Sequence, residues 1–306
     1  MVILVFGGTG LVGQALKKLE PDWIYLGSRD GDLRNMENCI EIFEKYKPKK
    51  IIFLAALVGG LYKNLDGNYD MFLNNMKMQM NIIECCNNYN VKDGIFCLST
   101  CIFPDKVEYP IKEEYLHKGP PHQSNYGYAY AKRNLEILCR MSNEKFKSNF
   151  KCISPTNIYG EYDNFNLTDS HVIPSLIHKA YLANKNNNNF TILGSGQTMR
   201  QFIYSGDVAK IIQTLISNPF IKNSIFIATP ENEYKIKDVG LIIAKNFNIP
   251  ESRIKFNTNY QDGQYKKTCS NEKLMSILGN FEFTLLENGL KQTIDWFKNH
   301  YPNVRK

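Results

Sequence analysis

Short apolar runs and amphipathic segments alternate through the first half of the chain. Runs rich in β-branched and aromatic residues, bounded by turn residues, predict five strands, at 2–6, 23–27, 49–56, 94–99 and 150–160. Between them, apolar residues at helical spacing predict four helices, one ending near Leu19 and the others at 36–46, around 78–89 and at 127–146. Strands that are apolar throughout are typical of a parallel sheet covered by helices on both faces. The pattern therefore predicts a doubly wound α/β sheet.

The pattern becomes less regular after residue 160. Helical spacing recurs at 172–183, 236–247 and 284–299, and one further strand is predicted at 224–230. We expect a Rossmann-type, doubly wound parallel sheet with a smaller C-terminal α/β lobe that binds the substrate. The sheet domain takes residues 1–160 and regains residues 201–229. The lobe takes residues 161–200 and 230–306.

Composition narrows the class of protein. The chain of 306 residues is 43% hydrophobic and 22% charged, as expected of a soluble globular protein. Its net charge of +7 is spread without a dense basic run, so no nucleic-acid partner is expected. No apolar run approaches the ~20 residues of a membrane span, and the run at the N-terminus is too short for a signal peptide. Eight cysteines without framework spacing indicate reduced thiols rather than disulfides or a metal site, and we expect a cytoplasmic protein.

A glycine-rich turn, GGTGLVG at 7–13, follows the first predicted strand and precedes a helix. Gly7, Gly10 and Gly13 allow a tight turn and a close approach of the backbone to a pyrophosphate at the helix N-terminus. The segment GSRDGDL after the second strand decides between two dinucleotides. Arg29 suits the 2′-phosphate of NADP and is favoured, whereas Asp30 suits the ribose hydroxyls of NAD and keeps that cofactor open.

The segment YAYAK places Tyr128 and Lys132 four residues apart, on one face of a predicted helix. A phenol with a pKa of ~10 exchanges its proton more readily at neutral pH beside an ammonium group. Ser99 ends the fourth strand, at the edge of the sheet where such folds bind ligands, and can donate to a reacting carbonyl. Together with the glycine turn, these residues predict a reductase. Cys101 is by itself either a packed thiol or a catalytic base.

Several segments carry a closer resemblance, over essentially the whole chain. In order they are LAALVGG (54–60), LSTCIFPD (98–105), YGYAYAKR (126–133), PTNIYGEYDNFN (155–166), SHVIP (170–174), GSGQTMRQFIYSGD (194–207) and DGQYKKTCSN (262–271). They resemble the eukaryotic-type GDP-L-fucose synthases of the extended short-chain dehydrogenase/reductase family, which are NADPH-dependent 3,5-epimerase-4-reductases. The glycine turn and the Tyr/Lys pair are common to that whole family, whereas Ser-x-Cys and Ser-His-Val-Ile-Pro are more specific.

The resemblance implies roles for individual residues. Cys101 would be the base and His171 the acid of epimerisation, and Tyr128 would donate the proton during reduction. The implied NADP(H) contacts, beside the glycines, Arg29 and Lys132, are Thr9, Leu11, Val12, Asp32, Leu33, Leu54, Ala55, Ala56, Pro155, Asn157 and His171. The implied contacts to a GDP-sugar are Asn157, Lys179, Leu193, Arg200, Asp262 and Lys267. The resemblance also implies a homodimer that pairs through the helices around 75–89 and 127–146.

Three positions depart from the pattern of the resembled enzymes. Leu193 stands where bacterial members have a tryptophan, so the site would lose aromatic stacking on the base. Lys179 replaces an arginine, and Glu161 replaces a proline. Two alternatives remain: another nucleotide-sugar epimerase or dehydratase of this fold, and an NADP-binding sensor without activity. A dehydratase needs a carboxylate just after the serine or threonine, and Ser99-Thr100-Cys101 has none.

Overall fold

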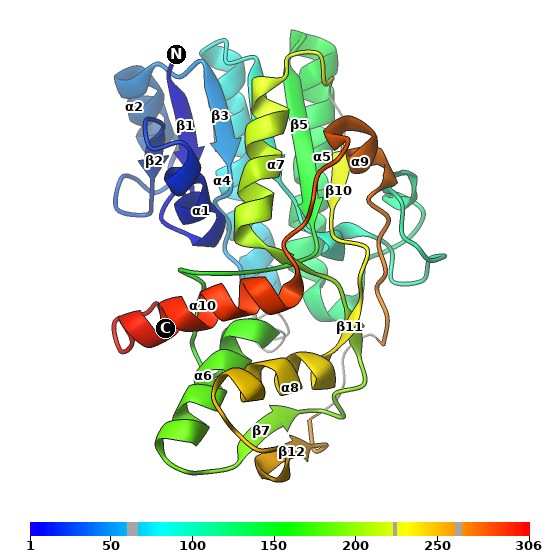
Figure 1. The fold of residues 1–306 in the computed structure, drawn as a ribbon. Helices are drawn as coiled ribbons and strands as arrows, with labels where there is room; N and C mark the ends of the chain where they lie inside the picture. Colours follow the sequence, from blue (N-terminus) through cyan, green and yellow to red (C-terminus); the bar gives the residue numbers. More distant parts are fainter. Residues whose placement is uncertain (60–66, 223–224, 261–264) are drawn as a thin grey trace.

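A six-stranded parallel sheet forms the centre of the larger domain (Figure 1). The structure is a computed structural model that describes residues 1–59, 67–222, 225–260 and 265–306. The strands lie in the order β10-β5-β4-β3-β1-β2. Their bounds are β1 Ile3–Phe6, β2 Ile24–Leu26, β3 Lys50–Phe53, β4 Asp93–Cys97, β5 Asn149–Pro155 and β10 Ile225–Ala228. The predicted Rossmann-type sheet is confirmed, with the strand order reversing between β1 and β3.

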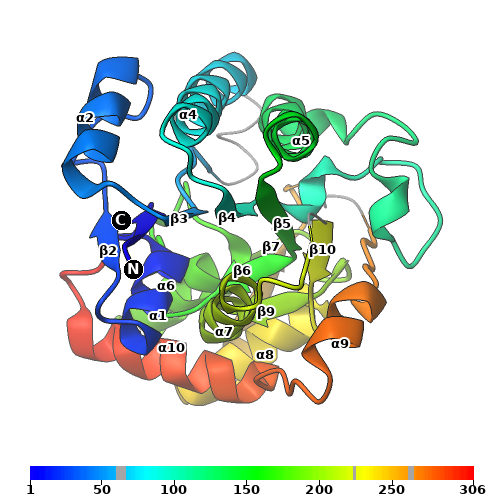
Figure 2. The ribbon, with the colours of Figure 1, turned by 90° about the horizontal axis from the view of Figure 1, so that it is seen from above.

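Helices cover both faces of this sheet, as Figure 2 shows from above. One face carries α2 (Met36–Tyr46), α4 (Asn68–Asn88) and α5 (Tyr126–Phe146), and the other carries α1 (Leu11–Leu19), α7 (Ser205–Ser217) and α9 (Glu272–Leu278). Alternate residues of β1 point to opposite faces, so Leu4 and Phe6 join one apolar cluster while Ile3 and Val5 join the other. This two-sided burial explains why the strands are apolar throughout.

A separate apolar cluster forms the smaller lobe, below the sheet in Figure 1. Helices α6 (Val172–Lys185), α8 (Ile236–Asn246) and α10 (Leu286–His300) enclose it together with the parallel pair β7 (Phe190–Leu193) and β12 (Ile254–Asn257). Phe165, Phe190 and Phe297 are fully buried there. The lobe therefore has its own core rather than being an extension of the sheet.

The run 150–160, predicted as one strand, is two strands in different sheets. β5 ends at Pro155, which has no N–H to continue the ladder, and β6 (Asn157–Tyr159) pairs instead with β9 (Phe202–Tyr204). A further two-stranded pair joins β8 (Met199–Arg200) to β11 (Tyr234–Lys235). The helix expected around 78–89 begins at Asn68, and α9 was not predicted. Because Leu274 of α9 packs into the cluster of the sheet domain, the expected division that gave 230–306 wholly to the lobe differs from the structure.

The described part of the chain has four short 3-10 turns in its connections: η1 (Thr100–Ile102), η2 (Glu113–Tyr115), η3 (Gln123–Asn125) and η4 (Glu251–Arg253). All eight cysteines are buried and free, as their spacing predicted. Among the described residues, no helix is both long enough and apolar enough to span a membrane.

Candidate active site

A cavity of about 1230 Å³ opens at the carboxyl ends of the parallel strands, between the sheet and the smaller lobe. Gly7, Leu54 and Ser99, each at or just beyond the end of a strand, contribute to its sheet side. His171 and Lys179 contribute from the lobe. Open α/β sheets bind ligands at this edge, next to the point where the strand order reverses.

The glycine turn forms one end of the cavity, together with Thr9, Leu11 and Val12. Gly7 has a φ of +81°, and a Cβ there would meet the backbone of Ala55 at 2.8 Å. A Cβ on Gly13 would lie 2.5 Å from the Cα of Gly8. At Gly10 an added Cβ would meet only the Gly7 oxygen, at 3.3 Å, so this glycine leaves free space at the start of α1. That space and the unpaired N–H groups of the helix N-terminus fit a dinucleotide pyrophosphate.

The loop after β2 forms the neighbouring part of the wall, through Gly27, Ser28, Gly31, Asp32, Leu33 and Arg34. Arg29, the predicted contact for a 2′-phosphate, is exposed and is not among the described residues that line the cavity. Arg34, which the sequence analysis did not single out, lines it and forms an ion pair with Asp32 at 2.7 Å. In the sequence its signal is a second basic residue in the same loop, eight positions after the end of β2.

Ser99, Cys101, Tyr128 and Lys132 line the middle of the cavity. The Ser99 hydroxyl accepts from the Cys101 N–H at 3.4 Å and so caps η1, the short turn that carries the thiol. Lys132 is 1% exposed and donates from Nζ to the Cys97 carbonyl at 2.7 Å, and the same nitrogen lies 5.9 Å from the centre of the Tyr128 ring. The helix spacing of four thus brings the phenol and the ammonium together, as predicted.

Burial controls the protonation of these groups. It raises the pKa of the Tyr128 phenol well above its usual value, and the nearby Cys101 and Cys97 add to the effect. It also raises the pKa of the Cys101 thiol, although the ammonium of Lys267, the Ser99 hydroxyl and Lys132 oppose this. Burial lowers the pKa of Lys132. Without a ligand the thiol and the phenol are therefore protonated near neutral pH.

His171 lines the cavity from the residue position just before α6, where the chain is extended (φ −69°, ψ 169°). The residue as a whole is exposed. Desolvation by the cavity walls lowers the pKa of His171, and the Arg305 guanidinium lowers it further. When it is protonated, this imidazolium is thus a stronger acid than a histidine in water.

The predicted substrate contacts collect on the lobe side. Asn157, Lys179, Leu193, Arg200 and Lys267 all line the cavity, whereas Asp262 lies outside the described residues. The segment after Lys267 is fixed by Gln201, which accepts from the Cys269 N–H at 2.8 Å and donates to its carbonyl at 3.1 Å. Burial lowers the pKa of Lys179, and Leu193 is 37% exposed. Three basic side chains, Lys179, Arg200 and Lys267, thus line the cavity, and side chains of this kind can bind phosphate oxygens.

Asp163 is a lining residue that the sequence analysis did not assign. It is 5% exposed, its Oδ1 accepts from the Asn164 N–H at 2.7 Å, and its Oδ2 has no partner among the described residues. Burial raises the pKa of this carboxyl to about 7. The sequence offers no periodic signal for a buried carboxylate in an irregular loop.

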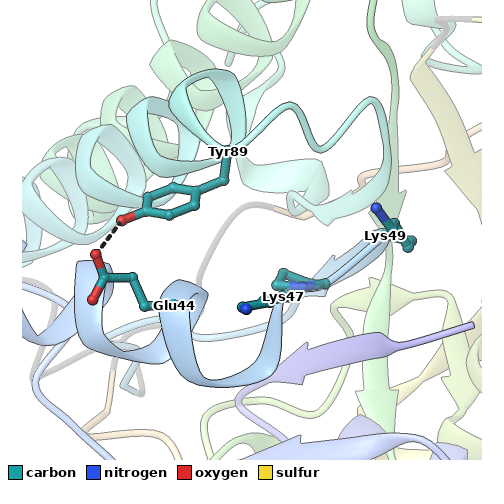
Figure 3. A pocket seen from close by; sticks show the side chains of 5 residues that line it. Glu44, Lys47, Lys49 and Tyr89 are labelled. Carbon is teal, nitrogen blue, oxygen red and sulfur yellow. Dashed lines mark hydrogen bonds between the residues drawn. The ribbon is translucent and has the colours of Figure 1, made fainter.

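A second cavity, of about 460 Å³, lies at the opposite end of β3 (Figure 3). Glu44, Lys47, Pro48, Lys49 and Tyr89 line it. The Tyr89 hydroxyl donates to Glu44 at 3.2 Å, so this carboxylate of α2 is bound to the residue that follows α4. Because it lies far from the strand ends that carry the glycine turn and the Tyr/Lys pair, it takes no part in the site described above.

Comparison with known proteins agrees with the fold and the motifs. Residues 3–227 match the NAD dependent epimerase/dehydratase family. The GDP-L-fucose synthase of Dictyostelium discoideum is 45% identical, covering 99% of this chain and 97% of that protein, and a probable GDP-L-fucose synthase of Drosophila melanogaster is 39% identical over 99% of both. The crystal structure of a GDP-L-fucose synthetase from Naegleria fowleri bound to NADP superposes with a TM-score of 0.93 at 44% identity, covering 100% of this chain and 95% of that one.

The chain therefore belongs to the NAD dependent epimerase/dehydratase family, and within it to the GDP-L-fucose synthases.

Proposed function

We propose that this protein is a GDP-L-fucose synthase. It converts GDP-4-keto-6-deoxy-D-mannose into GDP-L-fucose by epimerisation at C3 and C5 and reduction at C4, with NADPH as the cofactor. One observation carries the proposal: a thiol, an imidazole and a Tyr/Lys pair line a single cavity next to a dinucleotide-type glycine turn. The relatives that bear this name, and the NADP-bound structure of one of them, support it.

Epimerisation needs a base and an acid on opposite faces of the sugar. The ketone at C4 acidifies the hydrogens on C3 and C5, so each can leave as a proton and be replaced from the other face. Cys101 from the sheet side is the base, and His171 from the lobe side is the acid. Because burial raises the pKa of the thiol, we expect the rate of proton abstraction to increase with pH above neutrality.

Reduction at C4 uses the Tyr128/Lys132 pair. The bound cofactor supplies a hydride to C4. The Tyr128 hydroxyl delivers the proton to the C4 oxygen, and the Ser99 hydroxyl donates a hydrogen bond to the same oxygen while the ketone is held. Lys132, fixed by its bond to the Cys97 carbonyl, keeps positive charge beside the phenol as that proton leaves. No carboxylate follows Ser99, which disfavours a dehydratase, and a 4-epimerase alone would not need the thiol and imidazole.

The GDP end is held by charge. Lys179, Arg200 and Lys267 bind the diphosphate, and Asn157 completes the described part of the site. Leu193 offers the guanine an aliphatic side chain, 37% exposed, in place of an aromatic ring. Contact with this side chain provides burial but not ring stacking.

The protein also forms a homodimer in the cytoplasm. The support is an exposed apolar strip on the paired helices α4 and α5: Tyr69, Met80, Tyr126 and Met141 are each 49% exposed or more. Exposed apolar side chains of this size on adjacent helices suit a helix-to-helix interface. Light scattering would give twice the mass of one chain, and Met80→Glu together with Met141→Glu would return the monomer.

The central test uses GDP-4-keto-6-deoxy-D-mannose, NADPH and D₂O. The wild type should oxidise NADPH and form GDP-L-fucose with deuterium at C3 and C5. Cys101→Ser should lose this deuterium incorporation while it still binds NADPH. Cys97→Ser, which removes another thiol of the same cavity but keeps the backbone carbonyl that holds Lys132, is the matched control and should retain it. A wild type that binds NADPH and ignores this ketone would refute the substrate assignment.

A further inference from the structure

Arg133 is a buried cation beside the Tyr128/Lys132 pair, and the mechanism above gives it no role. It follows Lys132 directly on α5 and is 7% exposed. Its hydrogen bonds to the described residues all go to backbone carbonyls rather than to a carboxylate. A charge is costly to bury unless it is paired, so an arginine held in this way needs a reason. One of the carbonyls belongs to Ile102, the last residue of the turn that carries Cys101.

The guanidinium binds the Ile102 carbonyl through two nitrogens. Its Nε donates to this oxygen at 3.0 Å and its Nη2 donates to the same oxygen, while its Nη1 donates to the Gly119 carbonyl at 2.9 Å. A planar guanidinium presents these donors in a fixed fork, which the single nitrogen of a lysine does not reproduce. Burial lowers the pKa of Arg133, while Tyr130 and Cys101 act in the opposite direction, so the thiol lies close enough to interact with this charge.

The turn η1 is held only loosely by its own hydrogen bonds. The Cys101 N–H donates to the Ser99 hydroxyl at 3.4 Å, and the Ile102 N–H donates to the Ser99 carbonyl at 3.2 Å. The Phe103 N–H donates to the Thr100 carbonyl at 3.4 Å. All three bonds are longer than the ~2.9–3.0 Å that is typical of N–H···O contacts. The position of the thiol therefore depends on what holds this turn from outside.

Neighbouring residues of α5 hold the chain on both sides of the thiol. Lys132 donates to the Cys97 carbonyl at 2.7 Å, at the end of β4. Arg133 donates to the Ile102 carbonyl at 3.0 Å, at the end of η1. Cys101 lies between these two fixed points. Because both donors belong to one helix, the thiol keeps a constant position relative to that helix.

On the basis of the proposed function, we propose that Arg133 is a positioning residue, which holds the base Cys101 in place relative to the reducing pair Tyr128/Lys132. Proton abstraction at C3 and C5 requires a close approach of the thiol, and a misplacement of ~1 Å can slow such a step about 100-fold. Hydride transfer to C4 depends on Tyr128, which belongs to the helix itself, and on Ser99, which lies near the Lys132 contact. Loss of Arg133 therefore impairs epimerisation and spares hydride transfer.

The test measures the two steps separately. Deuterium exchange into GDP-4-keto-6-deoxy-D-mannose in D₂O, with NADP⁺ bound so that no hydride donor is present, reports epimerisation. Oxidation of GDP-L-fucose by NADP⁺ in a single turnover moves the C4 hydride to the cofactor and releases a proton, without epimerisation, and NADPH fluorescence follows it. The variants are Arg133→Met and Arg133→Lys. The matched control is Arg140→Gln, because Arg140 is an exposed arginine of the same helix, 3.4 Å from Glu136.

We expect Arg133→Met to lower kcat for exchange about 100-fold, with KM for the sugar nucleotide unchanged. Arg133→Lys keeps the charge but not the fork, so it should lower the same kcat about tenfold. Hydride transfer should stay within about threefold of the wild type in both variants, and Arg140→Gln should change neither step more than about twofold. A parallel loss of both steps would mean that Arg133 supports the fold in general, and would overturn the proposal.

The remaining outcomes also decide. Full exchange in Arg133→Lys would show that the fork is not required and would overturn the proposal as well. NADPH binding reports the folded state of each variant, and Arg133→Lys, the milder change, decides the matter if Arg133→Met does not fold. A wild type that exchanges no deuterium into this ketone would contradict the proposed function itself.

Discussion

Gly13 and Gly10 lie three residues apart in the cofactor turn, yet the structure predicts opposite consequences for the same substitution. At Gly13 a methyl group would lie 2.5 Å from the Cα and the oxygen of Gly8 and 2.6 Å from the oxygen of Gly7. These are backbone atoms of the turn, which cannot rotate away as a side chain can. At Gly10 the methyl would meet only one protein atom, at 3.3 Å.

The magnitude follows from these contacts. Ordinary van der Waals contact to a Cβ begins at 3.4 Å, so α1 and the turn must separate by about 0.9 Å to accept Gly13→Ala. Overpacking of this kind costs about 1–3 kcal/mol, and the better helix propensity of alanine recovers at most about 1 kcal/mol. We expect a net loss of roughly 1–2 kcal/mol and a fall in Tm of about 2–6 °C. Gly10→Ala should leave Tm within about 1 °C, since no packed atom moves.

The two substitutions should affect cofactor binding in the opposite order. The Gly10 methyl occupies the space left for the pyrophosphate, so Gly10→Ala should weaken NADPH at least tenfold with stability intact. Gly13→Ala should lose stability and, through the displaced turn, some affinity as well. Thermal unfolding and NADPH fluorescence titration of both variants provide the comparison. If Gly13→Ala unfolds at the wild-type temperature, or if Gly10→Ala binds NADPH normally, the geometric argument fails.

Three further predictions concern buried charge and solution pH. Asp93→Ala should destabilise the protein by about 3–5 kcal/mol, because Lys151, which is fully buried and 3.0 Å from Asp93, loses its ion pair. The control Glu272→Ala removes an exposed ion pair and should cost under about 1 kcal/mol in the same denaturant titration. Asp163→Asn should raise Tm at about pH 8 and leave it unchanged at about pH 4. In the folded protein the pKa of the Asp163 carboxyl is raised from 3.8 to about 7, so the wild type loses stability, at most about 4 kcal/mol, as the pH rises between these values. Equal Tm differences at both pH values would contradict this. The rate of deuterium exchange into the sugar should increase with pH above neutrality, as burial raises the pKa of Cys101, and a rate independent of pH would exclude the thiol as base.

Much of the sheet domain could be predicted because its signals are local. Each central strand is buried on both faces, so it is continuously apolar, and α2 begins and ends at the predicted residues Met36 and Tyr46. The run 150–160 was misassigned because β5 and β6 are both apolar. Only their partners, β4 and β10 for one and β9 for the other, show that they belong to different sheets. Pairing is a tertiary property that periodicity does not contain.

The candidate site likewise has features that the sequence predicts and features that only the folded structure reveals. The glycine turn and the Tyr128/Lys132 pair are local spacings, and the sequence by itself determined them, together with the family pattern around Cys101 and His171. Bringing the thiol and the imidazole to one cavity from two domains required the folded chain, because 70 residues separate them. The structure alone distinguished Arg34 from Arg29: both are basic residues of one loop, but of the two only Arg34 lines the cavity. It also revealed the buried carboxyl of Asp163, whose pKa depends on desolvation by residues distant in sequence.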